Sequence, residues 1–212
     1  MDLVNPLVQQ YAESFTSPED DLLKEINQFT AKNHPGYHML SGHLQGKFLA
    51  MVSHMIKPER VLEIGTFTGY SALCLASGLN TGGLLHTIEV REEDAATARG
   101  FFERSIWRSQ IILHTGNALD ILPNLDESWD LVFIDADKVS YIEYFKIVFP
   151  KVKQNGFILA DNIFFHGEVL EPPVKGKNAK AILEFNEFVR DREDIDKMIL
   201  TLRDGLYLIR KL

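Results

Sequence analysis

The sequence predicts an α/β protein with a mostly parallel sheet covered by helices on both faces. Three observations indicate this fold class. From residue 61 onward, short apolar runs of strand length alternate with segments of helical spacing, and such alternation is typical of parallel strands joined by helices. The first run breaks at Gly65, as a strand before a tight turn does. Asp204-Gly205, between the last two runs, is a hairpin-turn signal, so we expect one antiparallel strand.

The residues before this core are predicted to be helical. Residues 2–31 carry apolar side chains at helical spacing, with a start signal at Ser17–Asp20. Asn33–Gly36 breaks the pattern, and 45–55 resumes as a helix that ends before Pro58.

The core elements follow from the same periodicities and from the glycine and proline breaks between them. Small, helix-compatible residues begin a helix after Gly69. The remaining expected elements are strands 61–64, 84–88, 111–114, 131–134, 157–160, 197–202 and 205–210, helices 91–103, 118–122, 141–149 and 179–190, and a loop over 162–177.

Length and composition favour one globular domain. The chain has 212 residues, of which 45% are hydrophobic and 25% charged, as in ordinary globular proteins. There is no internal repeat or linker-like segment. We therefore expect a single domain over 1–212, in which helices in 1–57 contribute to the site and 58–212 forms the α/β core.

Charge and cysteine content narrow the functional classes. The formal net charge of -8 argues against a general nucleic-acid binder, which normally carries a basic face. A single cysteine, Cys74, excludes an intrachain disulfide and fits a cytoplasmic location. Met1–Gln10 lacks a signal-peptide pattern, and no apolar stretch approaches the ~20 residues needed to span a bilayer, so no membrane association is expected.

The stretch Val61–Ser71 predicts a ligand site. It reads as a buried strand, a glycine turn and a helix start. Such a turn lets a ligand approach the backbone closely. Its spacing, E-x-G-x-x-x-G, differs from the dinucleotide fingerprint G-x-G-x-x-G. We predict that this turn holds S-adenosylmethionine.

Polar residues directly follow several predicted strands, where ligands bind in open α/β sheets. Glu89 lies ~20 residues beyond the glycine turn, where an acid commonly accepts hydrogen bonds from ribose hydroxyls. A solvated acid at a strand end is the alternative. Gly116–Ala118 follows the third strand and could border an adenine ring.

Three oxygen-bearing side chains follow the fourth and fifth strands of the core. They are Asp135, Asp161 and Asn162, and such hard ligands suit Mg²⁺, with Mn²⁺ or Ca²⁺ as alternatives. If the two strands are neighbours, the side chains meet and leave positions for two adjacent oxygens of a substrate. The alternative is that each Asp caps a helix.

Lys138 lies three residues beyond Asp135 and is a candidate general base. A lysine that is partly desolvated beside a cation would have its ammonium form destabilised. The alternative is an exposed lysine paired with Asp137. His38 and His166 lack metal-ligand spacing but could touch a substrate.

With these motifs, the chain resembles the cation-dependent small-molecule O-methyltransferases, the group of caffeoyl-CoA and catechol O-methyltransferases and many bacterial relatives. The resemblance runs through nearly the whole chain, in order and at family-like spacing. The matching stretches are Met39–Ser41, Gln45–Leu49, Val61–Ser71, Glu89, Gly116–Ala118, Asp135–Lys138 with Tyr141, and Asp161-Asn162.

The resemblance implies a Rossmann-like, seven-stranded sheet whose last strand is antiparallel, and often a homodimer. It implies metal binding by Asp135, Asp161 and Asn162, and a base role for Lys138 as in the catechol-type members. The residues implied to contact S-adenosylmethionine are Met39, Ser41, Glu63, Gly65, Tyr70, Ser71, Glu89, Ala118 and Asp135.

Some positions depart from the family pattern. Gln45 stands where plant members usually have an acid, and Ser41 where they often have threonine. The plant substrate-loop pattern is incomplete, so caffeoyl-CoA itself is not implied. Residues 162–177 would form the acceptor pocket, where Phe164, Phe165 and His166 indicate either a flat aromatic acceptor or core packing.

We therefore predict a metal-dependent O-methyltransferase acting on a small aromatic diol. The alternative within the same chemistry is methylation of a hydroxyuridine in tRNA, which the acidic balance disfavours. A nicotinamide oxidoreductase would need a different glycine pattern, and a base N-methyltransferase would favour an Asn/Asp-Pro-Pro-aromatic motif after the fourth strand. A non-catalytic cofactor-binding protein would be expected to lack the acids or Lys138.

Overall fold

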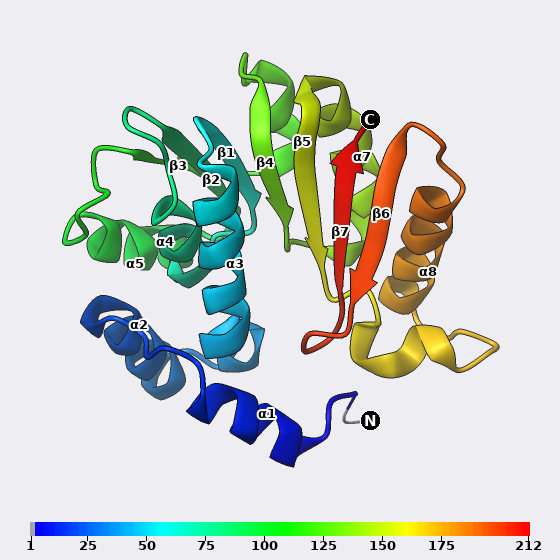
Figure 1. The fold of residues 1–212 in the computed structure, drawn as a ribbon, viewed down its shortest axis with the longest axis horizontal. Helices are drawn as coiled ribbons and strands as arrows, with labels where there is room; N and C mark the ends of the chain where they lie inside the picture. Colours follow the sequence, from blue (N-terminus) through cyan, green and yellow to red (C-terminus); the bar gives the residue numbers. More distant parts are fainter. Residues whose placement is uncertain (1–2) are drawn as a thin grey trace.

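The computed structural model describes residues 3–212 and contains one seven-stranded sheet (Figure 1). The strand order is β3-β2-β1-β4-β5-β7-β6, and β7 runs antiparallel to both of its neighbours, β5 and β6. The predicted seven-stranded, mostly parallel α/β fold is confirmed. The strands are β1 (Arg60–Ile64), β2 (Leu84–Glu89), β3 (Ile111–Thr115), β4 (Trp129–Ile134), β5 (Val152–Asp161), β6 (Ile195–Leu200) and β7 (Leu206–Lys211).

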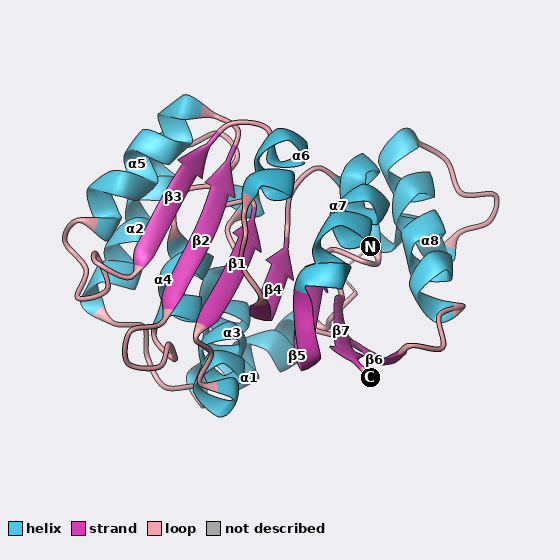
Figure 2. Ribbon diagram, turned by 90° about the horizontal axis from the view of Figure 1, so that it is seen from above, coloured by secondary structure: helices cyan, strands magenta, loops and turns pink. Residues whose placement is uncertain are grey.

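Helices cover both faces of the sheet (Figure 2). One face packs against α3, α4 and α5, and the other against α6, α7 and α8. The helices are α1 (Pro6–Ser14), α2 (Asp21–Asn33), α3 (Gly42–Ile56), α4 (Tyr70–Ala76), α5 (Glu92–Phe102), α6 (Ala118–Ile121), α7 (Tyr141–Val148) and α8 (Lys177–Arg190), with 3₁₀ turns at η1 (Tyr37–Met39), η2 (Leu122–Asn124), η3 (Lys138–Ser140), η4 (Phe149–Lys151) and η5 (Phe165–Leu170).

The central strands read as continuous apolar runs because they are buried on both faces. In β4, Val132 pairs with Ile158 toward one helix layer, whereas Phe133 pairs with Leu159 toward the other. The register also pairs Ile134 with Ala160. The residues that follow these strands therefore begin side by side at one edge of the sheet.

The N-terminal region is largely helical, as predicted for 2–31, and the predicted start signal at Ser17–Asp20 directly precedes α2; residue 2 lies outside the described residues. The chain forms two helices, α1 and α2, separated at 15–20. Each has its own N-cap: the Asn5 side chain accepts from the backbone N–H of Leu7 at 2.9 Å, and Asp20 accepts from Leu23 at 2.8 Å. Figure 1 shows α1 beyond the edge at which the parallel strands end.

Other boundaries differ by a few residues. Helix α3 begins at Gly42, β5 begins at Val152 and β6 begins at Ile195, each earlier than expected. The predicted 162–177 loop contains the 3₁₀ turn η5. Among residues 3–212, no helix combines the length and apolar composition needed to cross a bilayer; the cytoplasmic location and the single-domain organisation stay predictions.

Candidate active site

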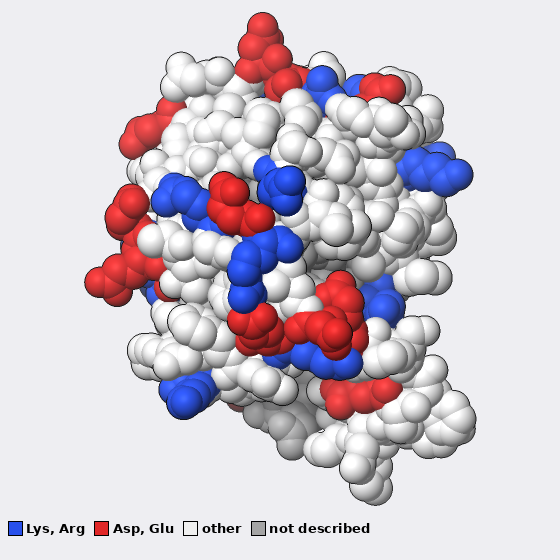
Figure 3. Space-filling view, turned by 90° about the vertical axis from the view of Figure 1, so that its left-hand side faces the viewer, with Lys and Arg blue, Asp and Glu red and all other residues white. Residues whose placement is uncertain are grey.

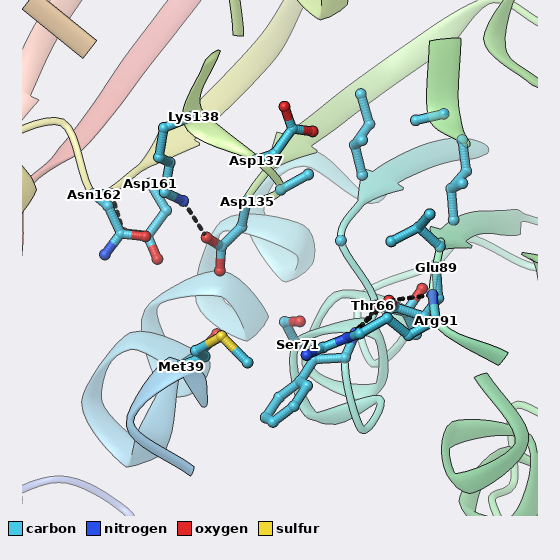
Figure 4. A pocket seen from close by; sticks show the side chains of 18 of the residues that line it. Met39, Thr66, Ser71, Glu89, Arg91, Asp135, Asp137, Lys138, Asp161 and Asn162 are labelled. Carbon is cyan, nitrogen blue, oxygen red and sulfur yellow. Dashed lines mark hydrogen bonds and ion pairs between the residues drawn. The ribbon is translucent and has the colours of Figure 1, made fainter. Parts of the chain in front are cut away.

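A cavity of about 560 Å³ opens at the carboxyl ends of the parallel strands (Figure 4). Its walls come from η1, from the segments that follow β1, β2, β3, β4 and β5, and from the β6–β7 hairpin. Of the predicted site residues, it gathers Met39, Ser41, Gly65, Tyr70, Ser71, Glu89, Ala118, Asp135, Lys138, Asp161 and Asn162.

The glycine turn is fixed by a close backbone approach. Gly65 has φ +104°, and a Cβ placed there would lie 2.2 Å from the carbonyl oxygen of Asp135. Only glycine fits such a contact in this conformation. The backbone N–H groups of Gly65 and Thr66 both donate to the Ile88 carbonyl, at 3.0 and 3.2 Å. These contacts join the loop after β1 to the ends of β2 and β4.

Glu63 is the one predicted site residue that does not line the cavity. Its side chain is fully buried, and its Oε2 accepts a hydrogen bond from Thr87 at 2.5 Å. Burial raises the pKa of this carboxyl, and the hydrogen bonds from Ser71 and Thr87 lower it. Burial is the larger effect, so the pKa rises to about 8. Its contact with a cofactor stays a prediction.

Glu89 is held in place by the loops on either side of it. Its carboxylate accepts from the backbone N–H of Phe67 at 2.7 Å and from that of Arg91 at 2.9 Å. The side chain is buried but lines the cavity. The alternative of a solvated strand-end acid does not fit this burial.

The remaining residues predicted to contact S-adenosylmethionine differ in exposure. Met39 in η1 is half-exposed, whereas Ser41, Tyr70, Ser71 and Ala118 are buried in the cavity wall. The Tyr70 hydroxyl donates to the Glu19 carboxylate. Tyr70 therefore ties the turn helix to the segment before α2, a contact that sequence spacing did not indicate.

Asp135, Asp161 and Asn162 face one another at the adjoining ends of β4 and β5 (Figure 4). Asp161 is buried, and its Oδ2 accepts from Gln45 Nε2 at 2.7 Å. The Asn162 amide nitrogen donates to Asp204 Oδ2 at 3.2 Å, which leaves its amide oxygen free of any hydrogen bond within residues 3–212. The neighbouring strands therefore bring the three predicted metal ligands together.

The oxygen atoms of this cluster fit a hard divalent cation. Asp135 Oδ2 and Asn162 Oδ1 accept no hydrogen bond from the described chain, and carboxylate and amide oxygens suit Mg²⁺. Burial raises the pKa of Asp135, Lys138 lowers it and the Asp161 charge raises it again, with a net rise; a cation would relieve this repulsion. Residues 3–212 hold no group of three His, Cys, Asp or Glu side chains placed for a metal; the third side chain of this cluster is an amide.

Lys138 is largely buried and pairs with Asp135, so the alternative of an exposed lysine paired with Asp137 is wrong. Its Nζ lies 3.0 Å from Asp135 Oδ1 and 2.8 Å from the Tyr141 hydroxyl, while Asp137 is bonded to Ser140 and Tyr144. Burial lowers the pKa of Lys138, but Tyr141, Asp135 and Asp161 raise it above its ordinary value. The destabilisation of the ammonium by a neighbouring cation stays a prediction.

Sequence reasoning missed three residues of the site. Tyr141 donates toward the carbonyls of Ile134 at 3.2 Å and Asp161 at 3.1 Å, and so joins the ends of β4 and β5. Gln45 reaches Asp161 across 116 residues of sequence. Arg203, in the β6–β7 hairpin, lines the cavity. Tyr141 and Gln45 lie in the matching motifs, but no spacing signal marks Arg203.

The 162–177 segment divides between packing and cavity. Phe164 packs beneath Gly205, where a Cβ would lie 2.5 Å from its ring, and joins the core. Phe165 and His166 line the cavity. His166 is exposed, with its Nδ1 3.8 Å from Asp204 Oδ2. The exposed His38, in η1, also lines the cavity.

Known proteins resemble the whole chain. A family model described as O-methyltransferase matches residues 13–212. A catechol O-methyltransferase of Niastella koreensis is 34% identical over 200 residues, covering 92% of this chain and 90% of that protein. Caffeoyl-CoA O-methyltransferase 1 of Eucalyptus globulus is 31% identical over 218 residues, covering 97% and 88%.

Solved structures of O-methyltransferases are also similar to this chain. The O-methyltransferase TomG of Streptomyces achromogenes, in complex with SAM, has a TM-score of 0.88 at 29% identity and covers 97% of this chain and 96% of its own. An O-methyltransferase of Bacillus cereus, in complex with SAH, has a TM-score of 0.89 at 30% identity, covering 97% of each. The predictions of the family and of an O-methyltransferase are confirmed: this chain belongs to the O-methyltransferase family.

Proposed function

We propose that the protein transfers the methyl group of S-adenosylmethionine to a hydroxyl of a small catechol-like acceptor with the help of a divalent cation. The observation that carries this proposal is the shared cavity, in which the glycine turn and Glu89 face the Asp135, Asp161 and Asn162 cluster. One end has the features of a donor site and the other those of an acceptor site. The solved relatives with bound SAM or SAH support the choice of donor.

At the donor end, every predicted contact except Glu63 lies in the cavity wall. The close approach at Gly65 leaves backbone exposed to the ligand. Glu89, held by two backbone N–H groups, retains oxygen lone pairs that can accept the ribose hydroxyls. Met39, Ser41, Tyr70, Ser71 and Ala118 enclose the rest of the donor.

At the acceptor end, Asp135, Asp161 and Asn162 hold the cation, with Mg²⁺ as the first choice and Mn²⁺ or Ca²⁺ as alternatives. When bound, this ion supplies a site for two adjacent oxygens and lowers the pKa of a hydroxyl. Gln45 fixes the orientation of Asp161, and Asp204 fixes that of Asn162. These contacts hold the ligand oxygens in place before the acceptor arrives.

Lys138 Nζ is the proposed acceptor of the hydroxyl proton, directly or through water. Its raised pKa means that Lys138 carries a proton in the protein alone. It must therefore release this proton before it can serve as a base. Tyr141, bonded to Nζ at 2.8 Å, fixes the position of the amine.

Neither the net charge nor the face of residues 3–212 shown in Figure 3 favours tRNA as the acceptor. On the side of the molecule near α5 and β3, basic and acidic side chains interleave (Figure 3), and the net charge is -8. The small aromatic diol is therefore retained as the acceptor class. Phe165 and His166 in the cavity wall support a flat aromatic ring.

A homodimer is also proposed. Helix α1 carries the exposed side chains Leu7, Tyr11 and Phe15, which are 74%, 66% and 75% exposed, and α3 adds Met51 and Met55 at 56% and 72%. Apolar surface of this extent commonly marks an interface. Sedimentation velocity of the protein and of a Tyr11→Glu/Phe15→Glu variant tests this: a variant with an unchanged sedimentation coefficient contradicts dimerisation through α1.

The metal role is tested by removing the ion. Initial rates of methyl transfer to caffeic acid are measured after chelation with EDTA and again after Mg²⁺, Mn²⁺ or Ca²⁺ is restored. We expect the rate to fall to background and to recover with the ion. Full activity in the stripped protein would exclude the metal and leave the donor site unaffected.

A further inference from the structure

Arg203 occupies an unusual position in the acceptor end of the cavity. It lies in the β6–β7 hairpin with φ +50°, in the left-handed region that a residue with a side chain rarely adopts. The next residues, Asp204 and Gly205, complete the turn, and Gly205 also has a positive φ of +84°. Backbone strain of this kind is a reason to ask what the side chain does.

The Arg203 guanidinium is held by one of its nitrogens. Nη1 donates to the Ser41 carbonyl and to Gln45 Oε1, the latter at 3.3 Å. Within residues 3–212, Nε and Nη2 make no hydrogen bond, and no carboxylate lies within ion-pair distance of the side chain. The guanidinium therefore keeps one edge, with two parallel N–H groups, for a ligand. Such an edge matches both oxygens of a carboxylate.

The carboxylates near Arg203 are already engaged. Asp135 contacts Lys138, and Asp161 accepts from Gln45. Asp204 accepts from the His166 backbone N–H at 2.7 Å and from Asn162. Gln45 connects Arg203 to this cluster, because its Oε1 accepts from Arg203 Nη1 and its Nε2 donates to Asp161. Within residues 3–212, none of these carboxylates therefore forms an ion pair with Arg203.

We propose that Arg203 is a specificity-determining residue that binds the carboxylate of an anionic catechol acceptor, a dihydroxylated aromatic acid. The inference rests on the proposed function and refines its acceptor class. The diol occupies the end near Asp135, Asp161 and Asn162, while the acid group is bound by the guanidinium on the hairpin side of the same cavity. The hold on Nη1 by Ser41 and Gln45 orients the free edge before the acceptor arrives.

The experiment compares acceptors that differ only in charge: 3,4-dihydroxybenzoate and its methyl ester. kcat/KM is measured for both with the wild-type protein, Arg203→Gln and Arg203→Lys. We expect the wild type to prefer the acid by about 10-fold or more, and Arg203→Gln to reduce the acid-to-ester ratio by about 10- to 100-fold. Arg203→Lys keeps the charge but loses the pair of parallel N–H groups, so its acid-to-ester ratio should lie between those of the wild type and Arg203→Gln. Arg210→Gln, exposed on β7, is the matched control and should keep the wild-type ratio.

Two further measurements separate the possible failures. Thermal unfolding and calorimetry with S-adenosylhomocysteine check that each variant folds and binds the donor product. If Arg203→Gln does not fold, the Arg203→Lys ratio decides. An acid-to-ester ratio that does not change overturns the inference and leaves Arg203 as a structural tie between the hairpin and α3. If the protein methylates neither acceptor, the proposed function is refuted. In that case calorimetry with 3,4-dihydroxybenzoate still tests the carboxylate contact. Weaker binding in Arg203→Gln would support the contact, and equal binding would overturn it.

Discussion

The donor end and the acceptor end of the cavity are built in different ways. The donor end uses short segments that directly follow β1 and β2, and backbone groups hold its key side chain, Glu89. The acceptor end depends on side-chain contacts between distant parts of the chain. Gln45 reaches Asp161 across 116 residues, and Arg203 reaches Ser41 across 162. The first end is therefore a local structure, and the second depends on the assembled fold.

The largest expected effect separates the two ends. Asp161→Ala should lower kcat by about 1000-fold or more, because it removes a proposed metal ligand, while the Kd for S-adenosylhomocysteine changes little. Steady-state rates and calorimetry measure the two quantities. Asp196→Asn, exposed on β6, is the control. Loss of S-adenosylhomocysteine binding in Asp161→Ala would show instead that Asp161 serves the donor end.

A second variant tests the backbone contact that joins the two ends. Gly65→Ala should reduce the free energy of unfolding by about 2–4 kcal/mol, because its Cβ would overlap the Asp135 carbonyl. Urea unfolding measures this loss. Gly82→Ala provides the control: Gly82 has φ +77° but open space around its Cβ, so it should lose only about 1 kcal/mol. Equal losses in the two variants would contradict the steric account.

Glu89→Gln should weaken the donor end alone. In the wild type, the two carboxylate oxygens accept from the backbone N–H groups of Phe67 and Arg91. In the variant, the amide NH₂ replaces one of these oxygens and faces an N–H group that it cannot accept from. We expect calorimetry to give a Kd for S-adenosylhomocysteine that is about 10-fold higher. The exposed Glu93→Gln on α5 is the control. If acceptor KM rises while the Kd stays unchanged, the assignment of Glu89 to the donor end is wrong.

The smallest effect concerns pH and the strands beneath the donor end. His86 on β2 contacts His114 on β3 at 3.1 Å. Burial, followed by the neighbouring His114, lowers the pKa of His86 below its ordinary value of 6.5. At this residue the unfolded chain therefore takes up a proton first as the pH falls, so the contribution of His86 to the free energy of unfolding should decrease from about pH 6.5 downward.

His86→Phe should remove this pH-dependent contribution, because the variant keeps the aromatic packing against Trp129 and loses the titrating group. Urea unfolding between pH 7.5 and 5.5 compares the slope of the free energy of unfolding in the two proteins. His54→Gln, exposed on α3, should keep the wild-type slope. If His86→Phe has the same slope as the wild type, the pH dependence does not come from His86.

The same contrast explains what the sequence could predict. Gly65, Glu89, Asp135 and Asp161 stand directly after apolar strands, so the general rule for open α/β sheets locates them. The partner of Lys138 could not be predicted, because two acids lie within three residues of it and only the packing of α7 selects Asp135. Arg203 carries no motif. Its importance appears only when the hairpin is folded against α3.

The hairpin also has a consequence for the order in which the chain is made. β7 pairs with β5 along five residue pairs, from Phe157–Arg210 to Asp161–Leu206. During synthesis, β5 therefore exposes an unpaired edge until the ribosome has released residues beyond 206, and such an edge can associate with other chains. The donor end, whose Gly65 turn packs against the Asp135 carbonyl, has all of its strands once β4 ends at residue 134. Nascent protein would therefore be able to form the donor end before the acceptor end exists, with an aggregation-prone edge exposed in the interval.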